Sequence, residues 1–449
     1  MTLLASQLRE LENPNLSVDS RAEQCCQAAR AFEDKGEYEH ARQVLSHYWQ
    51  RIGERPNVTG LQPGTSAEML LRVGVLTGVI GSNNQLADAQ EKAKDLISES
   101  LTVFESCNYK QKISEAQIEL ALCYWRTGEN SEARDLLKTA LSQLPSDSNL
   151  KAKAVVRLAI VELEETNYDQ ALSILTESDA LFEKINSQTL KGSYYSTRAN
   201  VLERLWETET RTEYLDRALV DYAAASYHFE QAEHRVYLAN VENSLGHLYF
   251  AISQCDDAHN HLDHARRVSA SLKDVNGVAK VDETRACVFL KQGRLAEAER
   301  VASAAVRVQE QSGRHALLAE ALTTYGRALA RLEKYGAALF AFRRAVDLYE
   351  QNSNSPQAAD AALAAFREIG EHLVVAERGQ FLSGRALVED KLTMEREVIK
   401  LALEQSDGHI TQAARSLGMS WQALSYALST RHKELLTVRK PVRHRKQKR

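Results

Sequence analysis

The most distinctive binding chemistry in the sequence lies near its C-terminal end. Gln422 carries an amide that can pair bidentately with adenine, and the aromatic residues Trp421 and Tyr426 lie close to it. Downstream, residues 431–449 contain nine Lys or Arg and one Glu, although the whole chain has a formal net charge of −5. A dense basic segment attracts phosphate backbones. These residues therefore favour nucleic-acid binding at this end of the chain.

Two short helices are predicted to position these side chains. Thr411 and Ser420 are candidate N-caps, because their hydroxyls can accept from free backbone N–H groups. Gly418 suits the tight turn between the helices, and a preceding helix, residues 394–405, closes the small core. The predicted apolar seam consists of Ala413, Ala414, Leu417, Met419, Leu424 and Leu428, to which the preceding helix adds Val398, Leu401 and Ala402.

The run GHITQAARSLGM, residues 408–419, resembles the Fis-type helix-turn-helix (factor for inversion stimulation), which also occurs at the C-terminus of many bacterial transcription activators. The second helix departs from that family because uncharged residues replace most of its usual Arg and Lys. We therefore expect the basic tail to supply most of the affinity for phosphates. The resemblance and the tail together predict DNA contacts from Thr411, Ser420, Trp421, Gln422, Ser425, Tyr426, Arg431, Lys433, Arg439 and Lys440.

A helical pattern repeats between residues 23 and 350. A small residue is followed twelve positions later by alanine, as in Ala29 and Ala41, Ala121 and Ala133, Ala159 and Ala171, Gly246 and Ala258, Ala286 and Ala298, and Gly326 and Ala338. The second alanines recur with a period of 40 from Ala218 onward. Two antiparallel helices approach closely where Gly or Ala lies at their crossing. The pattern therefore predicts stacked helical pairs.

This spacing resembles the tetratricopeptide repeat, a helix-turn-helix pair that stacks into a right-handed superhelix. The chain has only six prolines and many helix-forming residues, which predicts an all-α protein. The period exceeds the usual repeat of roughly 34 residues, so the helices or the linkers must be longer. We expect about eight repeats in residues 1–350, capping helices and a linker in 351–384, a three-helix unit in 385–436 and a disordered basic tail in 437–449.

Polar residues on two predicted first helices are candidates for binding a partner. Asn240, Asn243 and His247 lie at i, i+3 and i+7, so they share one helix face. Asparagine both donates and accepts hydrogen bonds, which suits an extended peptide. Arg327 and Arg331, four residues apart, can hold a carboxylate or a phosphate. In the repeat family, first helices line the groove, and we expect these residues to bind a regulatory peptide or partner protein. The alternative is an ordinary solvated face.

Other reactive groups in the sequence do not form a recognisable site. Cys255 and His259, or Asp257 and His261, have a spacing that can bring two ligands to one metal. However, Ala258 lies on the predicted buried face, which spreads the histidines over the exposed side. The chain contains no nucleotide-binding loop, metalloprotease motif or nucleophile elbow. We therefore expect no enzyme activity, no cofactor and no metal.

The N-terminal and apolar segments favour a cytoplasmic protein. Residues 1–12 lack a basic start followed by a long apolar run. The most apolar window, residues 69–80, contains Arg72 and is too short to cross a membrane. The six cysteines include no C-x-x-C pair, which predicts free thiols in a reducing compartment. A redox switch at the adjacent Cys25 and Cys26 is the alternative.

Together these features favour a DNA-binding transcriptional regulator whose repeat domain binds a regulatory peptide or partner protein. The expected partners are duplex DNA, a protein or peptide in the groove, no membrane and, by analogy with other helix-turn-helix proteins, a second copy of the chain. Two alternatives stay open: a non-enzymatic scaffold without sequence-specific DNA binding, and an RNA-binding protein that uses the basic tail. The surface of residues 421–426 distinguishes the DNA-binding regulator from the scaffold, because a DNA-binding protein leaves this surface exposed and an adaptor buries it.

Overall fold

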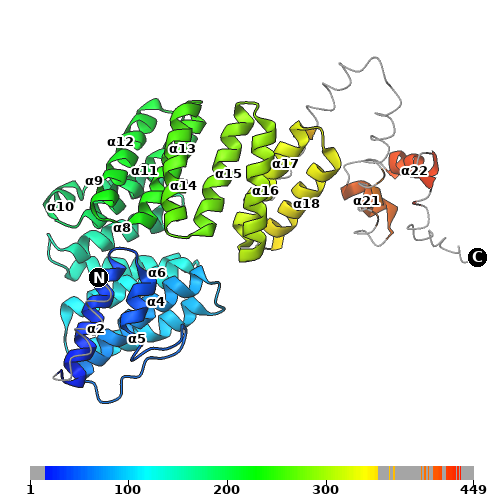
Figure 1. The fold of residues 1–449 in the computed structure, drawn as a ribbon. Coiled ribbons are helices and arrows are strands. Elements are labelled where there is room, and N and C mark those ends of the chain that lie inside the picture. The colour runs from blue at the N-terminus through cyan, green and yellow to red at the C-terminus, as the bar shows by residue number, and fades with distance from the viewer. Residues whose placement is uncertain are drawn as a thin grey trace, which may run out of the picture.

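The computed structural model describes residues 16–351 without a gap (Figure 1). Beyond them it describes residues 364, 368–369, 396, 399–400, 403, 408–416, 421–430, 432–433 and 435. Every regular element within these residues is helical. The all-α prediction is therefore confirmed.

Residues 16–351 form eight antiparallel helical pairs and one short extra helix. The first helices are α2 (Val18–Glu33), α4 (Pro63–Asn83), α6 (Lys110–Arg126), α8 (Asn149–Glu164), α11 (Gln188–Glu209), α13 (Arg235–Ala251), α15 (Val275–Lys291) and α17 (His315–Arg331). The second helices are α3 (Tyr38–Val44), α5 (Ala89–Ser106), α7 (Asn130–Gln143), α9 (Tyr168–Thr176), α12 (Thr212–Gln231), α14 (Cys255–Ser271), α16 (Leu295–Ser312) and α18 (Tyr335–Gln351). The extra helix is α10 (Asp179–Lys184), and the number of pairs agrees with the predicted number of repeats.

Small residues lie where the two helices of a pair cross. The alanines at 218, 258, 298 and 338 are all fully buried. At Gly246 an added Cβ would lie 2.5 Å from Leu262 Cγ, and at Gly326 it would lie 3.0 Å from the Phe342 ring. The helices therefore approach so closely that even one extra methyl group has no room at Gly246.

Regular turns explain the 40-residue period of the second half of the array. One residue in the left-handed conformation lies between successive helices from α12 to α18, with φ between +54° and +73°; these residues are Glu233, Ser253, Lys273, Gly293, Gly313 and Glu333. They recur every 20 residues. Helices α13 to α18 are each 17 or 18 residues long. Longer helices, rather than longer linkers, therefore account for the long period.

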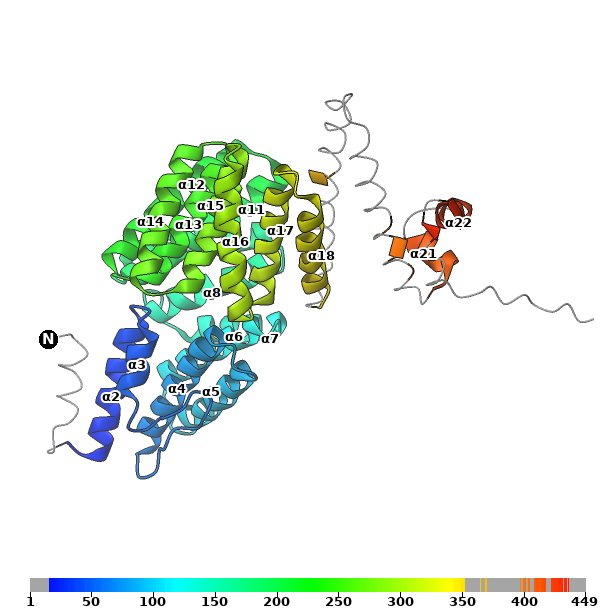
Figure 2. The ribbon, with the colours of Figure 1, turned by 45° about the vertical axis from the view of Figure 1, so that its right-hand side comes forward.

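The array coils so that its N-terminal pairs meet helices far along the chain (Figures 1 and 2). Lys35 Nζ lies 3.0 Å from Glu233 Oε2, and the Thr189 hydroxyl donates to the Asp34 carbonyl at 3.2 Å. Closer to the other end, Arg314 Nη2 donates to the Asn83 carbonyl at 3.1 Å. The coil therefore brings the turn after α2 against the start of α13, and the turn after α4 against the start of α17.

Two short helices near the C-terminus, α21 (Ile410–Ser416) and α22 (Trp421–Thr430), share a small apolar core. The buried residues are Ile399, Leu403, Ile410, Ala413, Ala414, Leu424, Ala427, Leu428 and Leu435. They include four of the six predicted seam residues, whereas Leu417, Met419, Val398, Leu401 and Ala402 lie outside the described residues. A preceding segment with Ile399 and Leu403 closes this core, so three segments build the unit.

The start of α21 differs from the prediction that Thr411 caps the helix. Helix α21 begins at Ile410, so Thr411 is its second residue, and the first turn accepts at the His409 carbonyl. Gly408, with φ +76°, donates to the Leu403 carbonyl at 2.8 Å and reverses the chain directly before the helix. This turn starts the helix earlier than Thr411 would as a cap.

Helix α4, which contains the apolar residues 69–80, lies inside the array. Its buried residues include Met69, Leu70, Leu71 and Val73, together with the fully enclosed Arg72. In the described part of the chain, no helix is both long and apolar enough to span a membrane. The apolar run of α4 is therefore explained by packing between neighbouring pairs.

The close approach at Gly246 predicts a loss of stability on substitution. Gly246→Ala should lower the free energy of unfolding by about 1–3 kcal/mol, because the new methyl group overlaps Leu262. Gly336→Ala is the matched control, because no atom lies within 4 Å of its added Cβ and alanine favours a helix. Urea denaturation of both variants measures the difference. Equal stability of the two variants would contradict this account of the crossing.

Candidate functional site

One side of α13 carries the polar residues that the sequence analysis singled out. Asn240 is exposed, His247 is half-exposed, and Asn243 is only 8% exposed. The Oδ1 atom of Asn243 is buried without a hydrogen-bond partner among the described residues. His247 Nδ1 lies 3.4 Å from Glu203 Oε1 on α11, and this contact raises the pKa of His247. Asn240 and His247 thus lie on α13 beside Asn243, whose side-chain oxygen is an unsatisfied acceptor.

Acidic groups continue this face onto α15 and α17. Glu283 lies 40 residues after Asn243, and its Oε1 atom accepts hydrogen bonds from the Thr324 hydroxyl and the Cys287 thiol. Burial raises the pKa of Glu283. Glu320 reaches solvent, yet surrounding protein and then Glu283 raise its pKa as well. Two carboxyl groups with reduced acidity therefore lie near the end of the array.

The paired arginines of α17 hold a carboxylate that belongs to this chain. Arg331 donates to Glu368 from Nε at 2.9 Å and from Nη2 at 2.8 Å, and Arg327 Nε donates to Glu368 at 3.2 Å. Burial alone would raise the pKa of Glu368, but the hydrogen bonds from Arg331 and Arg327 lower it overall. Arg327 and Arg331 therefore join α17 to the segment that follows α18.

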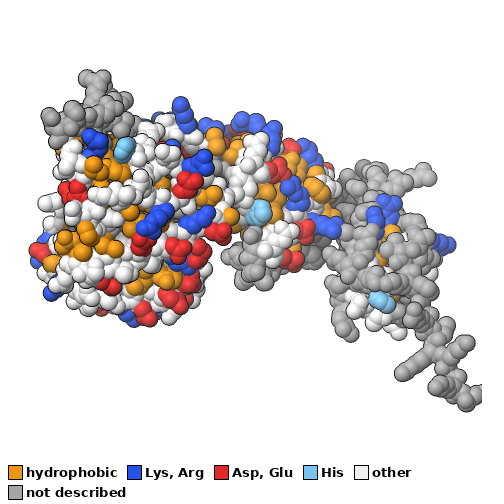
Figure 3. Space-filling model, turned by 90° about the horizontal axis from the view of Figure 1, so that it is seen from below, with side chains coloured by type: hydrophobic (Ala, Val, Ile, Leu, Met, Phe, Trp, Pro, Cys, Tyr) orange, Lys and Arg blue, Asp and Glu red, His pale blue; other side chains and the backbone are white. Residues whose placement is uncertain are grey.

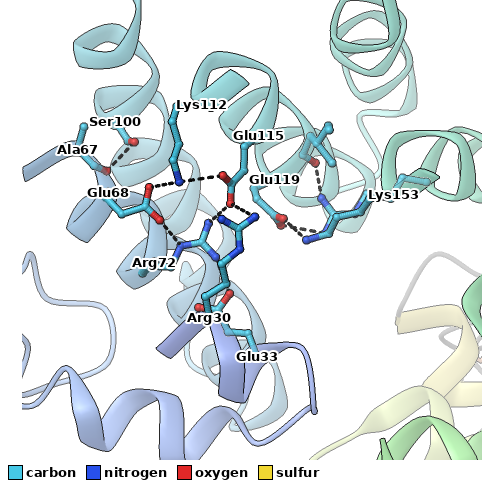
Figure 4. Close-up of polar contacts among 12 residues, drawn as sticks. Arg30, Glu33, Ala67, Glu68, Arg72, Ser100, Lys112, Glu115, Glu119 and Lys153 are labelled. Carbon is cyan, nitrogen blue, oxygen red and sulfur yellow. Dashed lines mark hydrogen bonds and ion pairs between the residues drawn. The ribbon is translucent and has the colours of Figure 1, made fainter. Parts of the chain in front are cut away.

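A network of ion pairs crosses the first helices of the N-terminal pairs (Figure 4). Arg72 is 2% exposed, and its guanidinium lies 2.7 Å from Glu33 Oε2, 2.7 Å from Glu115 Oε1 and 3.3 Å from Glu68 Oε1. Lys112 pairs with both Glu68 and Glu115. Figure 4 shows these side chains converging from α2, α4 and α6. A buried guanidinium is tolerated here because carboxylates surround it.

The network continues onto α8 through Glu119. Arg157 Nη2 lies 2.8 Å from Glu119 Oε2, and Lys153 Nζ pairs with the other oxygen of the same carboxylate. Burial would raise the pKa of Glu119, but Arg157 and Lys153 lower it strongly. Sequence reasoning missed this network, because the partners come from four different helices. The available signals were the spacings of opposite charges within one helix, Glu68 with Arg72 and Lys112 with Glu115.

Glu33 differs from the other carboxylates of this network. Among the described residues its cation partner is Arg72, which Glu68 and Glu115 share, and its Oε1 atom is buried there without a hydrogen bond. Burial therefore raises its pKa to about 7, although Arg72 opposes the shift. Glu33 is thus the member of the network that exchanges a proton near neutral pH.

The C-terminal unit presents a polar face on α22. Gln422 is exposed, Tyr426 is 66% exposed, and Ser425 is partly exposed between them. Thr411 on α21 and Lys433 after α22 are exposed as well. The other predicted DNA contacts, Ser420, Arg431, Arg439 and Lys440, lie outside the described residues, as does the side-chain environment of Trp421. Where it is described, the predicted reading face is open to solvent.

Comparison with protein families assigns both parts of the chain. Residues 278–351 match the tetratricopeptide repeat, and residues 393–429 match the bacterial regulatory proteins of the Fis family. The chain carries a tetratricopeptide-repeat array and a Fis-type helix-turn-helix domain. Both assignments confirm the resemblances seen in the sequence. No curated protein shows significant sequence similarity to the chain.

Solved structures with a similar fold are repeat proteins of comparable length. The apo form of the quorum sensor NprR from B. thuringiensis aligns with a TM-score of 0.53 and 11% identity over 77% of this chain and 92% of that chain. A Rap protein complexed with Competence and Sporulation Factor aligns at 0.51 and 14% over 83% and 100%. Aspartyl phosphate phosphatase F from Bacillus subtilis aligns at 0.50 and 13% over 80% and 90%. At these identities the similarity concerns the fold of the array.

The histidines of α14 in the tetratricopeptide-repeat array bind a carboxylate instead of each other. His261 Nδ1 lies 2.8 Å and His264 Nδ1 lies 3.2 Å from Glu242 Oε2, while His259 faces Gln292 and Phe289. Within the described ranges, no group of three or more His, Cys, Asp or Glu is arranged to hold a metal ion. His261 and His264 therefore link α14 to α13, whereas His259 links α14 to the end of α15.

The cysteines of the array are free thiols. Cys25 and Cys26 are buried, and burial raises the pKa of Cys25 to about 11 and that of Cys26 further. Thiol chemistry requires the thiolate, which burial disfavours at neutral pH.

On the surface, Figure 3 shows acidic and basic side chains interspersed over the face seen from below. Binding on that face depends on individual groups more than on a broad field of one sign.

The raised pKa of Glu33 predicts a specific pH dependence. An unfolded glutamate has a pKa near 4.5, whereas the pKa of Glu33 in the folded array is about 7. Folding therefore takes up a proton when the pH lies between these two pKa values. The stabilisation is complete below pH 4.5 and is lost as the pH rises through 7. Glu33→Gln should therefore be more stable than the wild type by about 2 kcal/mol at pH 8 and should lose this advantage near pH 5.

Thermal unfolding of Glu33→Gln between pH 5 and pH 8 checks this expectation. Glu105→Gln is the matched control, because Glu105 is exposed on α5 and forms no ion pair with another described residue. A pH-independent difference between Glu33→Gln and the wild type would contradict the protonation of Glu33.

Proposed function

We propose that this protein is a DNA-binding transcriptional regulator whose repeat array binds a regulatory peptide or partner protein. The observation that carries the proposal is the division of α22 into two faces. Leu424, Ala427 and Leu428 pack in the core of the unit, whereas Gln422 and Tyr426 are exposed. A recognition helix needs this arrangement, because one face is anchored while the other contacts base edges in the major groove.

The array supports a role in sensing. Asn243 has a buried side-chain oxygen without a partner in the described region, and the exposed Asn240 and His247 lie next to it on α13. An extended peptide offers N–H donors at regular spacing, which such a face can bind. Two proteins with a similar fold are described as a quorum sensor and as a complex with Competence and Sporulation Factor. These descriptions make a peptide the best candidate ligand for the array.

A scaffold without sequence-specific DNA binding is the second candidate. Helix α22 has the sequence WQALSYALST and contains neither Lys nor Arg. Neutralised phosphates supply most of the non-specific affinity of DNA-binding proteins, so this helix alone binds the backbone weakly. In the favoured reading the basic residues after α22 supply these contacts, while Gln422 reads a base.

The DNA-binding proposal predicts the effect of one substitution. Gln422→Ala should relax the sequence preference at a single base pair and weaken specific binding by about 1–3 kcal/mol, because the bidentate amide contact is lost. Selection of random duplexes at several salt concentrations measures this with the full-length protein. Gln143→Ala is the matched control, because Gln143 is exposed on α7 of the array and should leave binding unchanged.

The same selection separates the candidate functions. A defined sequence enriched by the wild type supports the regulator. Weak binding without sequence preference would favour the scaffold, and preferential recovery of RNA in a parallel selection would favour the RNA-binding alternative.

The segment after α18 offers a route from the array to the DNA-binding domain. Ile369 packs against Leu329, Ala330 and Phe342, and Glu368 binds both arginines of α17. In our proposal a change in the first helices of the last pairs is passed through these contacts to the following domain. Such contacts can transmit a change from the array to the next domain, because packed side chains switch between a few discrete arrangements instead of deforming continuously.

This coupling predicts that Glu368 affects DNA binding at a distance. Glu368→Gln removes the charge between Arg327 and Arg331 and should change the DNA affinity of the full-length protein by about 5-fold or more. Fluorescence anisotropy with the selected duplex measures the change. Glu350→Gln, at the exposed end of α18, is the control. An affinity equal to that of the wild type would show that the joint does not transmit a change to the DNA-binding domain.

A further inference from the structure

A surface hollow of about 310 Å³ is shared by α14, the second helix of one pair, and α15, the first helix of the next pair. Three of its five lining side chains are arginines. The lining consists of Asn260, Asp263, Arg266 and Arg267 from α14 and Arg285 from α15. The spacing of the four α14 residues puts them on one side of that helix. Several guanidinium groups therefore meet at one place on the surface, and we call this group the arginine cluster.

Two aspartates hold the arginine cluster in place. Asp282 is 7% exposed, and its Oδ1 atom accepts hydrogen bonds from Arg266 Nε at 2.8 Å and from Arg285 Nη1 at 3.1 Å. Arg285 Nη2 lies 3.0 Å from Asp263 Oδ1, and Arg267 Nε donates to the Asp263 backbone carbonyl at 3.2 Å. Within this cluster three guanidinium groups face two carboxylates, so one positive charge is not neutralised.

The ends of Arg266 and Arg267 are suited to an oxyanion. Each side chain is held through its Nε atom, and the Nη atoms of both form no hydrogen bond with a described residue. The Arg266 side chain is 44% exposed and Arg267 is exposed, so solvent reaches both. A guanidinium that is already fixed at Nε loses less side-chain freedom when its Nη atoms bind a ligand. The two arginines therefore form a preorganised pair of donors at the hollow.

Stacking of the repeats does not require the arginine cluster. We compare the positions of Asp263, Arg266 and Arg285 with the positions 40 residues away in the neighbouring pairs. These positions hold Ala223, Ser226 and Leu245 on one side and Ser303, Val306 and Tyr325 on the other. None of the six is charged, although the same regular turns connect the helices from α12 to α18. The cluster is thus a local addition to a regular architecture, which is typical of a binding site.

We propose that this hollow binds a small phosphate monoester that also carries hydroxyl groups, such as a sugar phosphate. A phosphate monoester has a charge of about −1.5 to −2 at neutral pH and three acceptor oxygens, so it engages two guanidinium groups at once. A carboxylate has one charge and two oxygens, which a single arginine satisfies. The doubled site of Arg266 and Arg267 therefore favours phosphate.

The rest of the hollow suits the hydroxyl groups of such a ligand. Asn260 is exposed at the hollow, and its amide both donates and accepts hydrogen bonds. The Oδ1 atom of Asp263 pairs with Arg285, which leaves the Oδ2 atom to accept from a hydroxyl group. The volume lies at the lower end of the range of ligand pockets, roughly 300–1,000 Å³, and so fits a small molecule. The site uses none of the residues proposed to bind DNA or a peptide, and it goes beyond that function.

Isothermal titration calorimetry with the full-length protein tests the site at constant ionic strength in a buffer without phosphate. The probes are ribose 5-phosphate, inorganic phosphate, ribose and acetate. The proteins are the wild type, Arg267→Gln and Arg307→Gln. Arg307 is the matched control, because it lies 40 residues after Arg267, is exposed on α16, and also donates from Nε to the carbonyl four residues earlier, that of Ser303 at 3.3 Å. Circular dichroism checks folding, which both substitutions should preserve because neither arginine forms an ion pair with a described residue.

The wild type and Arg307→Gln should bind ribose 5-phosphate with equal affinity, and Arg267→Gln should bind it about 10- to 100-fold more weakly. Inorganic phosphate should bind more weakly than ribose 5-phosphate, and ribose and acetate should not bind. Inorganic phosphate that binds as tightly as ribose 5-phosphate would overturn the hydroxyl contacts of Asn260 and Asp263.

Three results would overturn the phosphate site itself: no binding of ribose 5-phosphate by the wild type, unchanged binding by Arg267→Gln, or acetate that binds as tightly as the phosphates. The affinity of the same proteins for duplex DNA distinguishes the other source of phosphate groups. Weaker DNA binding by Arg267→Gln, without binding of ribose 5-phosphate by the wild type, would assign Arg267 to the DNA backbone and overturn the small-molecule site.

Discussion

The close contact between the two helices of each pair is the constraint on which the array depends. Fully buried alanines, or glycines such as Gly246 and Gly326, lie at the crossings, and a left-handed residue ends each helix of the second half at intervals of 20 residues. Identical crossings and turns give each pair the same rotation relative to its neighbour. The coil and the meeting of the turn after α2 with the start of α13 both follow from this repetition.

Charges on the first helices are neutralised between pairs more often than within them. Arg72 on α4 reaches Glu33 on α2 and Glu115 on α6, Arg157 on α8 reaches Glu119 on α6, and Arg331 reaches Glu368. Each such ion pair ties one repeat to the next, and removal of one partner leaves a poorly solvated charge. The array therefore gains specificity of stacking from charged residues of its first helices.

Sequence reasoning succeeded where the physical cause is local. The crossings at Ala258 and Ala298 and the buried side of α22 follow from spacing within one or two helices, so periodicity predicted them. The contacts of Lys35 with Glu233 and of Arg314 with Asn83 depend on the pitch of the coil, which adds small rotations over several repeats. No pattern in the sequence reports that sum. Thr411 was misplaced for a different reason, because the turn at Gly408 starts α21 before the residue type that usually caps a helix.

The two places where the coil closes differ in stiffness. At α13 the closure is aromatic, with the buried His234 stacked on Tyr237 and packed on the turn at Gly36. At α17 it consists of the exposed hydrogen bond from Arg314 to Asn83 and the contact of Gln85 with Gly313. Exposed polar contacts contribute little stability, so we expect the second closure to separate first, with every helical pair intact. We therefore expect the array to open at the contact near α17 and to stay closed at the contact near α13.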